Sequence, residues 1–408
     1  MALMVYQKVL EEKISENDEE IFFKPFEETF TILIFSMVFG MIYPSDRMKN
    51  WQILGFFGFI IIMIPALSAV YYDMYLAYLD RDMDTIFRHL IVIGPFNALY
   101  LKWVYMYYYR QQSKDAIEEM NRYFANLNSK PITHKRIAKK WLIRSFFLEK
   151  SWAYCLIVGS FSFPVMAICK TTYSTLFDEE PRRYFIHELR SPQGPGMNYE
   201  FPFFEVLFVN TCIASCMYFL NFSGYDGFFV QLILHTCMRM AICGEAVKDS
   251  FKIDDKAMRR SALHKVIDEH IAICHFMDNI NCIFVQWMSL FTVALTIHVC
   301  ICVFHLSEGT YQDMEFMFAF TAASIYLCMI TTCGGLVEEE SENLADTFYQ
   351  SGWERVLDTH CNYLLVFMIA RAQKTFRVRT LFHVHVNHEL LIAIVKMAYT
   401  LLTFLKQT

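Results

Sequence analysis

Two groups of side chains have the types and spacing that could bind a metal ion. They are His383-x-His385-x-x-His388 near the carboxyl end and the set His298, Cys300, Cys302 and His305. Imidazole and thiolate groups at such spacings are common zinc ligands. The first group follows an arginine-rich segment, which favours a solvated stretch or contact with lipid headgroups. We therefore assign a metal to neither group.

The sequence contains no motif that indicates catalysis. We find no nucleophile with an adjacent base, no phosphate-binding loop and no paired carboxylates. The sequence therefore predicts no enzyme and no cofactor. The net charge of −6 is too small and of the wrong sign to suggest a nucleic-acid partner.

The composition instead indicates a protein that crosses a lipid bilayer several times. Of the 408 residues, 55% are hydrophobic and the mean hydropathy is +0.28, which is too apolar for one soluble core of this size. The 39 Phe and 23 Tyr suit membrane interfaces and cavities for hydrophobic ligands. Thirteen cysteines lie mostly inside apolar runs without a C-x-x-C pair, which predicts buried thiols.

Apolar runs predict seven spans that follow a polar leader at 1–25. A short apolar stretch at 29–43 stops at Pro44, and we expect an interfacial or re-entrant helix there. The spans are expected at 51–72, 86–108, 145–169, from about 201, to about 305, 316–333 and 381–405. Prolines lie inside the first three spans and should kink them.

The fourth and fifth patterns are longer than a membrane requires. Residues 203–247 contain no proline, and 45 helical residues span roughly 68 Å, against about 30 Å of hydrocarbon. The pattern at 257–305 is similar, with a polar first half. We expect both helices to extend into the cytosol and to bundle there.

Lys and Arg indicate the orientation of the chain. They concentrate at 110–144, 248–265 and 355–379, and the alternate loops are poorer in them. Basic loops stay in the cytosol, so the N-terminus is expected inside and the C-terminus outside. A G-protein-coupled receptor has the opposite orientation.

Four motifs resemble those of insect odorant receptors. The stop before the first span is Phe39-Gly40-Met41-Ile42-Tyr43-Pro44, and the sixth span closes with Leu336-Val337-Glu338-Glu339. Between the last two spans lie Tyr349-x-Ser351-x-Trp353 and Arg371-x-Gln373-Lys374, and the last helix carries Ile394-Val395-Lys396-x-x-Tyr399. The chain departs from the family at Leu381-Phe382, where Gly-Lys is usual, and at Ala398, where Ser is usual.

The resemblance implies an all-α fold with seven transmembrane helices and a pore-forming tetramer. It implies an odorant-gated, non-selective cation channel subunit that binds a small volatile hydrophobic ligand. The short connection at 247–260 resembles a tuning subunit, so a co-receptor is the implied partner in a heterotetramer. The implied location is the plasma membrane of olfactory sensory neurons.

Four regions follow from this assignment. We expect a leader with the short helix at 1–50, the first six spans with an outer ligand pocket at 51–336, a cytosolic anchor at 337–380 and a pore-lining helix at 381–408. In the anchor, the resemblance assigns Tyr349, Trp353, Arg371 and Gln373 to the subunit interface.

The last helix is expected to line the pore, and the chain ends three residues after Leu405. The resemblance places the gate at Leu402, and helical spacing puts four residues on one face: Val395, Ala398, Leu402 and Leu405. Aliphatic rings gate by excluding water. From spacing alone, an ordinary packed helix is the alternative. Lys396 is expected to point toward neighbouring helices, because a lysine repels cations in a pore, or to snorkel along the helix.

The implied ligand pocket lies in the outer half, between the second, third, fourth and sixth spans. Counting from the motifs and by depth nominates nine residues: Val92, Pro95, Phe96, Gly159, Phe163, Phe208, Cys212, Phe318 and Thr321. Such walls bind a volatile by dispersion and desolvation, with Thr321 as the hydrogen-bonding candidate. For each residue alone, core packing is an equal alternative.

Other receptor classes remain open. A gustatory receptor channel shares the architecture, but its last helix typically shows Thr-Tyr and a Gln-Phe ending, where this chain has Ala398-Tyr399 and Leu405-Lys406. A G-protein-coupled chemoreceptor conflicts with the expected orientation. A transporter lacks support, because we find no internal repeat.

Overall fold

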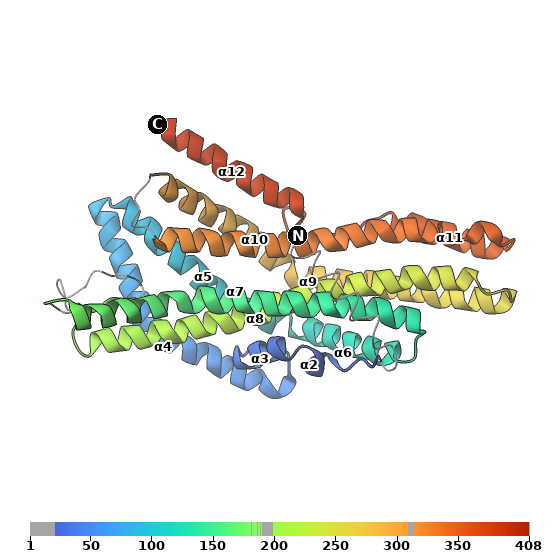
Figure 1. Cartoon of the computed structure of the whole chain (residues 1–408), viewed down its shortest axis with the longest axis horizontal. Helices are drawn as coiled ribbons and strands as arrows, with labels where there is room; N and C mark the ends of the chain where they lie inside the picture. The colour runs from blue at the N-terminus through green and yellow to red at the C-terminus, as the bar shows by residue number, and fades with distance from the viewer. Residues whose placement is uncertain are drawn as a thin grey trace.

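The computed structural model describes residues 21–180, 182–185, 187, 189, 199–308 and 314–407, and every regular element in this part is helical. An isolated antiparallel bridge pairs Arg379 with His385. Figure 1 shows long helices lying side by side, with α12 leaning away from them. The long helices are α4 (Lys49–Asp80), α5 (Met83–Tyr108), α7 (Ile132–Phe177), α8 (Phe203–Phe251), α9 (Lys256–Glu308) and α10 (Met314–Tyr349). The shorter helices are α2 (Phe26–Thr29), α3 (Thr31–Phe39), η1 (Asp46–Met48), α6 (Arg110–Leu127), η3 (Trp353–Arg355), α11 (Thr359–Ala372) and α12 (His388–Gln407).

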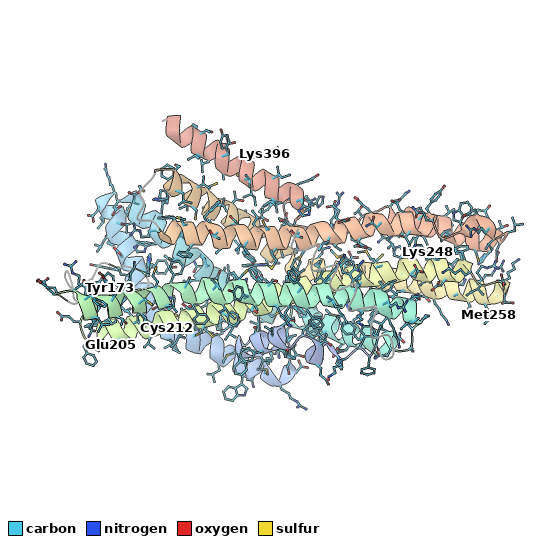
Figure 2. All side chains as sticks on the ribbon, in the orientation of Figure 1. Tyr173, Glu205, Cys212, Lys248, Met258 and Lys396 are labelled. Atoms are coloured by element: carbon cyan, nitrogen blue, oxygen red, sulfur yellow. The ribbon has the colours of Figure 1, made fainter. Side chains whose placement is uncertain are left out.

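Helix α8 is the centre of the bundle. Every residue from Asn221 to Met240 is buried, so this part of α8 is enclosed on all sides. Helices α7, α10, α9 and α3 pack around it. We call the end that carries the α7–α8 connection the α7–α8 end, and the opposite end the α8–α9 end. Glu205 and Cys212 lie near the first end and Met258 near the second (Figure 2).

The prediction of two long continuous helices is confirmed. Helix α8 has 49 residues and α9 has 53, about 74 and 80 Å at 1.5 Å per residue. Two other boundaries were predicted too narrowly. Helix α7 begins at Ile132, just after Pro131, so part of the expected basic loop is helical. Helix α10 continues to Tyr349, so the expected anchor begins inside a helix.

Five helices in the described part are long and apolar enough to cross a membrane, namely α4, α7, α8, α9 and α10. Helices α5 and α12, which we predicted as the second and seventh spans, are not in that set. The turn between α4 and α5 is tight. Arg81 ends α4 with a φ of 57°, and the Asp82 side chain accepts a hydrogen bond from the Thr85 amide.

The last helix begins at His388, seven residues after the predicted start at Leu381. The preceding segment folds back on itself, because the Val386 amide donates to the Val378 carbonyl and the Thr380 amide donates to the Val384 carbonyl. Asn387 then caps α12, since its side chain accepts from the amides of Glu389 and Leu390. A polar cap was a stronger start signal than the apolar Leu381-Phe382.

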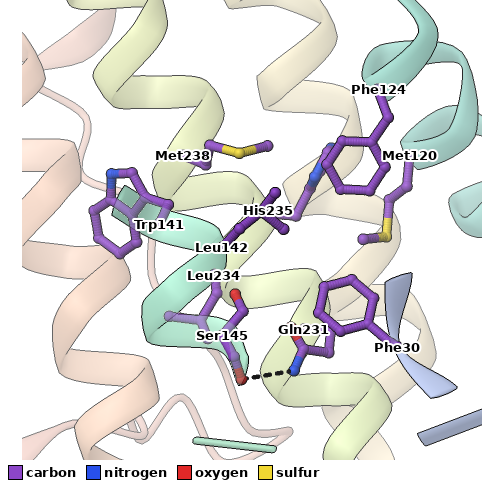
Figure 3. Close-up of a pocket in the computed structure, with 10 residues that line it drawn as sticks. All are labelled: Phe30, Met120, Phe124, Trp141, Leu142, Ser145, Gln231, Leu234, His235 and Met238. Atoms are coloured by element: carbon purple, nitrogen blue, oxygen red, sulfur yellow. Dashed lines mark hydrogen bonds between the residues drawn. The ribbon is translucent and has the colours of Figure 1, made fainter. Parts of the chain in front are cut away.

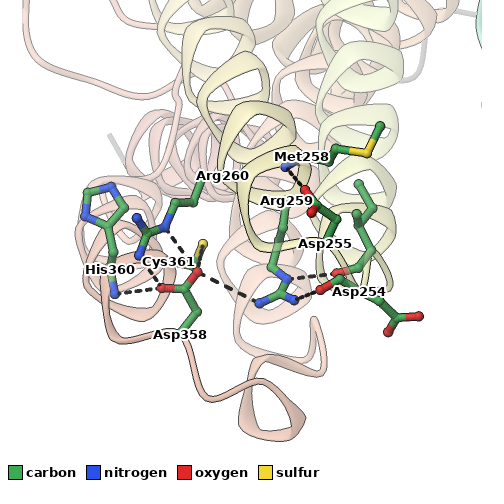
Figure 4. Close-up of polar contacts among 9 residues, drawn as sticks. Asp254, Asp255, Met258, Arg259, Arg260, Asp358, His360 and Cys361 are labelled. Atoms are coloured by element: carbon green, nitrogen blue, oxygen red, sulfur yellow. Dashed lines mark hydrogen bonds and ion pairs between the residues drawn. The ribbon is translucent and has the colours of Figure 1, made fainter.

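A charged cluster fixes α11 at the α8–α9 end (Figure 4). Asp358 caps α11 and accepts two hydrogen bonds from Arg260 of α9, at 2.9 and 3.2 Å. Arg259 lies 3.9 Å from the same carboxylate. The Arg260 hydrogen bond holds the pKa of the Asp358 carboxyl well below its usual value. Asp358 therefore stays ionised at neutral pH and joins α11 to α9.

Candidate functional site

A cavity lies near the α7–α8 end, between α4, α5, α8 and the segment that precedes α8. Its empty volume is about 590 Å³ including its open mouth. The lining residues are Met63, Ala66, Leu67, Val70, Val92, Ile93, Phe96, Phe185, His187, Leu189, Leu207, Thr211 and Ala214. Of the nine nominated pocket residues, Val92 and Phe96 are among them. Sequence reasoning missed the two polar members, His187 and Thr211.

His187 belongs to a buried chain of polar contacts that includes His89 and Asp73. His187 Nε2 lies 2.8 Å from His89 Nδ1, and His89 Nε2 lies 3.1 Å from Asp73 Oδ2. The three residues are at most 8% exposed. Asp73 and His89 lie on either side of the α4–α5 turn, so that turn sets their pairing. His187 lies about a hundred residues later, and only the folded chain brings it to them.

Thr211 makes its hydrogen bonds within α8. Its hydroxyl lies 2.9 Å from the Phe208 carbonyl and 3.1 Å from the Leu207 carbonyl, to which it donates its proton. This is a frequent arrangement for a threonine inside a helix. The oxygen can then only accept a hydrogen bond from the cavity side.

The remaining nominated residues lie outside the cavity lining. Phe163 of α7 and Phe318 of α10 contact each other, with ring centroids 5.7 Å apart. The Thr321 hydroxyl is exposed and donates to the Met317 carbonyl of its own helix. The others are partly or fully exposed: Pro95, Gly159, Phe208 and Cys212. The α7 and α10 residues therefore form a separate group from the α4, α5 and α8 wall.

A second, smaller space lies between α3, α6, α7 and α8 (Figure 3). Phe30, Phe124 and Trp141 enclose it, and the Gln231 amide donates to the Ser145 carbonyl at 3.3 Å. His235 is buried beside it and makes no hydrogen bond within the described residues. With about 200 Å³ of empty volume, this space is much smaller than the first cavity.

A buried ion pair crosses the middle of the bundle. Lys102 Nζ of α5 lies 2.5 Å from Asp226 Oδ2 of α8, and both side chains are at most 1% exposed. The Tyr326 hydroxyl of α10 donates to Asp226 Oδ1 at 2.9 Å. The ammonium also lies 3.1 Å from the centroid of the Phe222 ring, a cation–π contact. Three helices are thus joined at one point, which lone charges in apolar runs could have signalled.

Helix α12 packs on α9 and α10 through one face. Leu390, Ile394 and Ala398 are buried in the core of the chain. The opposite side is exposed and carries polar side chains at helical spacing: Glu389, Lys396 and Thr400. The predicted single pore face is therefore divided, because Ala398 is buried, Val395 is 56% exposed and Leu402 is partly buried. The Leu405 side chain lies outside the described residues.

Two glycines of α10 bring its backbone close to the start of α12. A Cβ atom at Gly334 would lie 1.7 Å from the Val386 carbonyl oxygen, and one at Gly335 would lie 2.8 Å from the His388 imidazole. The Asn387 amide also donates to Glu338 of α10 at 2.9 Å. Movement of α10 is therefore expected to displace the base of α12.

The residues assigned to the anchor interface lie at the surface. Tyr349, Arg371 and Gln373 are exposed, and the Trp353 indole donates to the Tyr349 carbonyl at 3.1 Å. Helix α11 buries Cys361, Leu365, Met368 and Ala372. Its other face exposes Tyr363, Val366 and Phe367, each at least 60% accessible. An apolar face of this kind marks a surface for contact with another protein or with lipid.

Comparisons with known proteins agree on one group. Residues 82–399 match the family model described as 7tm Odorant receptor. Odorant receptor 85c of Drosophila melanogaster is 26% identical over 148 residues, which cover 35% of this chain and 37% of that protein. The match thus spans little more than a third of the length of that relative.

Two solved structures share the fold. The insect olfactory receptor OR5 from Machilis hrabei in complex with eugenol is similar with a TM-score of 0.74 and 15% identity, covering 93% of this chain and 98% of that chain. A structure of OR5 described without a ligand gives 0.69 and 15% identity, covering 88% and 89%.

Proposed function

Because this chain belongs to the 7tm odorant receptor family, we propose that it is an odorant-gated cation channel subunit. A small volatile hydrophobic ligand binds in the α4–α5–α8 cavity. We propose this cavity as the outer transmembrane pocket, instead of the expected pocket between the second, third, fourth and sixth spans. The subunit works with a co-receptor in a heterotetramer in the plasma membrane of olfactory sensory neurons, with its N-terminus in the cytosol. This orientation puts the cavity in the outer half.

The polar stripe on α12 is the observation that carries the channel proposal. Ionisable and hydroxyl groups that face lipid are costly in a membrane helix. On α12 they lie on the side that this subunit leaves uncovered, and in a ring of subunits that side faces water. Glu389 and Thr400 then line the conduction path. Lys396 is exposed on the same side, which corrects the expectation that it points toward neighbouring helices. Leu402 lies beside the packing face and is the candidate gate.

Ligand-evoked current in excised patches tests the proposal. We expect cation current that persists without nucleotides when the chain is expressed with a co-receptor, and none from either subunit alone under the same ligand. A response that appears only in whole cells and requires GTP contradicts direct gating and supports a coupled receptor.

Cysteine substitution on α12 tests the pore face. Lys396→Cys and Thr400→Cys are expected to react with a charged, water-soluble thiol reagent and to lose most of the ligand-evoked current. Ala398→Cys is the matched control, since Ala398 is buried on the packing face, and the unmodified chain controls for native thiols. Equal reactivity at Ala398 and Lys396 contradicts this assignment of faces.

The exposed α11 face supports the assembly proposal. Phe367→Ala is expected to weaken association with the co-receptor by about 30-fold, because a buried aromatic anchor contributes about 2 kcal/mol or more. Co-purification at matched expression measures this effect. Leu357→Ala is the control, because Leu357 is fully exposed but precedes α11. If both variants assemble normally, the interface lies elsewhere.

A further inference from the structure

We infer that the α4–α5–α8 cavity selects ligands that carry a hydroxyl group, such as alcohols and phenols, over ethers and esters. The inference rests on the proposed function, because it names the ligand class of the same site. It follows from the two polar side chains among the described lining residues, Thr211 and His187. Both side chains donate their hydrogen bonds to other groups of the protein.

Thr211 has a single hydroxyl proton, and the carbonyls of Leu207 and Phe208 take it. The lone pairs of Oγ1 are what remain for a ligand. A ligand O–H can donate to this oxygen. The oxygen of an ether or an ester finds no donor here.

The tautomer of His187 follows from its two neighbours in the chain of polar contacts. The Asp73 carboxylate accepts, so the proton of neutral His89 lies on Nε2 and His89 Nδ1 must accept. His187 therefore donates through Nε2, at 2.8 Å. A neutral imidazole carries one N–H, and that of His187 is already used. His187, like Thr211, offers no proton to the cavity.

The other described lining residues are apolar, so none of their side chains can donate a hydrogen bond to a ligand acceptor. Val92, Phe96 and Leu207 represent this surface. A buried oxygen without a hydrogen bond costs free energy. In a purely apolar cavity, the ether leaves water more easily than the alcohol of equal size and binds better. A preference for the alcohol therefore reports the acceptors and not the general hydrophobicity of the site.

The test uses matched pairs of ligands with the same number of heavy atoms. Alkan-1-ols of six to ten carbons are compared with their isomeric methyl ethers, with simple phenols and their methyl ethers as a second series. Ligand-evoked current is recorded with the co-receptor. We expect the alcohols to act at concentrations about tenfold lower than the ethers, which corresponds to one net hydrogen bond.

Variants then locate the preference. Thr211→Val keeps the shape of the side chain and removes the acceptor, so the ratio of alcohol to ether potency is expected to fall from about ten toward one. Thr321→Val makes the same change on α10, outside the cavity, and should leave the ratio unchanged. His89→Leu removes the acceptor of the His187 proton, so that proton can be donated to a ligand. Ethers should then gain potency relative to alcohols. A merely structural role for His89 does not predict this gain. Surface labelling confirms that each variant reaches the membrane.

The possible outcomes separate the inferred ligand class from the proposed channel function on which it rests. Ethers equal to or better than alcohols on the unmodified chain overturn the ligand class, while current from either series leaves the channel proposal intact. An unchanged ratio in Thr211→Val overturns the role of the cavity. If His89→Leu fails to fold, the unmodified chain and Thr211→Val still decide. Absence of current from every ligand, with both subunits at the surface, overturns the proposed function and the inference together.

Discussion

Asp226→Asn is expected to destabilise the protein by about 3–5 kcal/mol and to abolish ligand-evoked current. The substitution leaves the Lys102 ammonium in the centre of the bundle without its counter-charge, and an uncompensated buried charge carries this cost. It also removes the charged acceptor of the Tyr326 hydroxyl. Thermal unfolding of the purified protein and patch recording measure the two effects.

Two further variants separate charge from shape. Replacing both partners with apolar residues, Lys102→Met with Asp226→Leu, should recover most of the stability, since no charge remains buried. Glu28→Gln is the matched control, because Glu28 pairs with Lys24 at the surface, where an ion pair contributes little. If Asp226→Asn is as stable as Glu28→Gln, the buried pair does not stabilise the bundle.

The second large effect is expected from Gly334→Ala. The added methyl group would overlap the Val386 carbonyl oxygen, a backbone atom that cannot turn aside. The base of α12 must move away from α10, and overpacking of this kind costs about 1–3 kcal/mol. We expect a lower unfolding temperature and altered gating, measured as the ratio of basal to ligand-evoked current.

Other glycines of the chain provide graded controls. Gly335→Ala meets the His388 side chain, which can rotate, so its effect should be smaller. Gly159→Ala has open space around the added atom and should be neutral or slightly stabilising, because alanine favours a helix. A Gly334→Ala variant that resembles Gly159→Ala in both measurements contradicts the close contact between α10 and α12.

Local sequence patterns predicted the helices, but they could not predict which residues distant in the chain contact each other. The absence of proline from 203–247 and the mixed polarity of 257–305 were sufficient to predict α8 and α9. Periodicity alone could not choose which face of α12 packs, because Ala398 and Lys396 both lie in an apolar run. Their burial depends on where α9 and α10 stand.

The cavity lining was predicted only in part, because it too depends on contacts between distant parts of the chain. Counting from motifs found Val92 and Phe96, which lie on a regular helix at a fixed distance from Lys102. It missed His187, which lies between helices, and Thr211, whose hydroxyl is common in apolar helices. Lys102 and Asp226 are 124 residues apart, and no local rule pairs them. A lone charge in an apolar run was the available signal.

The exposed face of α11 has a consequence for the life of the chain before it assembles. Tyr363, Val366 and Phe367 form an exposed apolar surface. In the proposed assembly, a subunit without its partner leaves this surface uncovered, and we expect chaperones and proteases to act on it. Once a partner covers this face, it is no longer accessible to them. If the chain assembles as proposed, a cell that makes it in excess is expected to destroy the surplus, so that the supply of the partner sets how many assembled channels form.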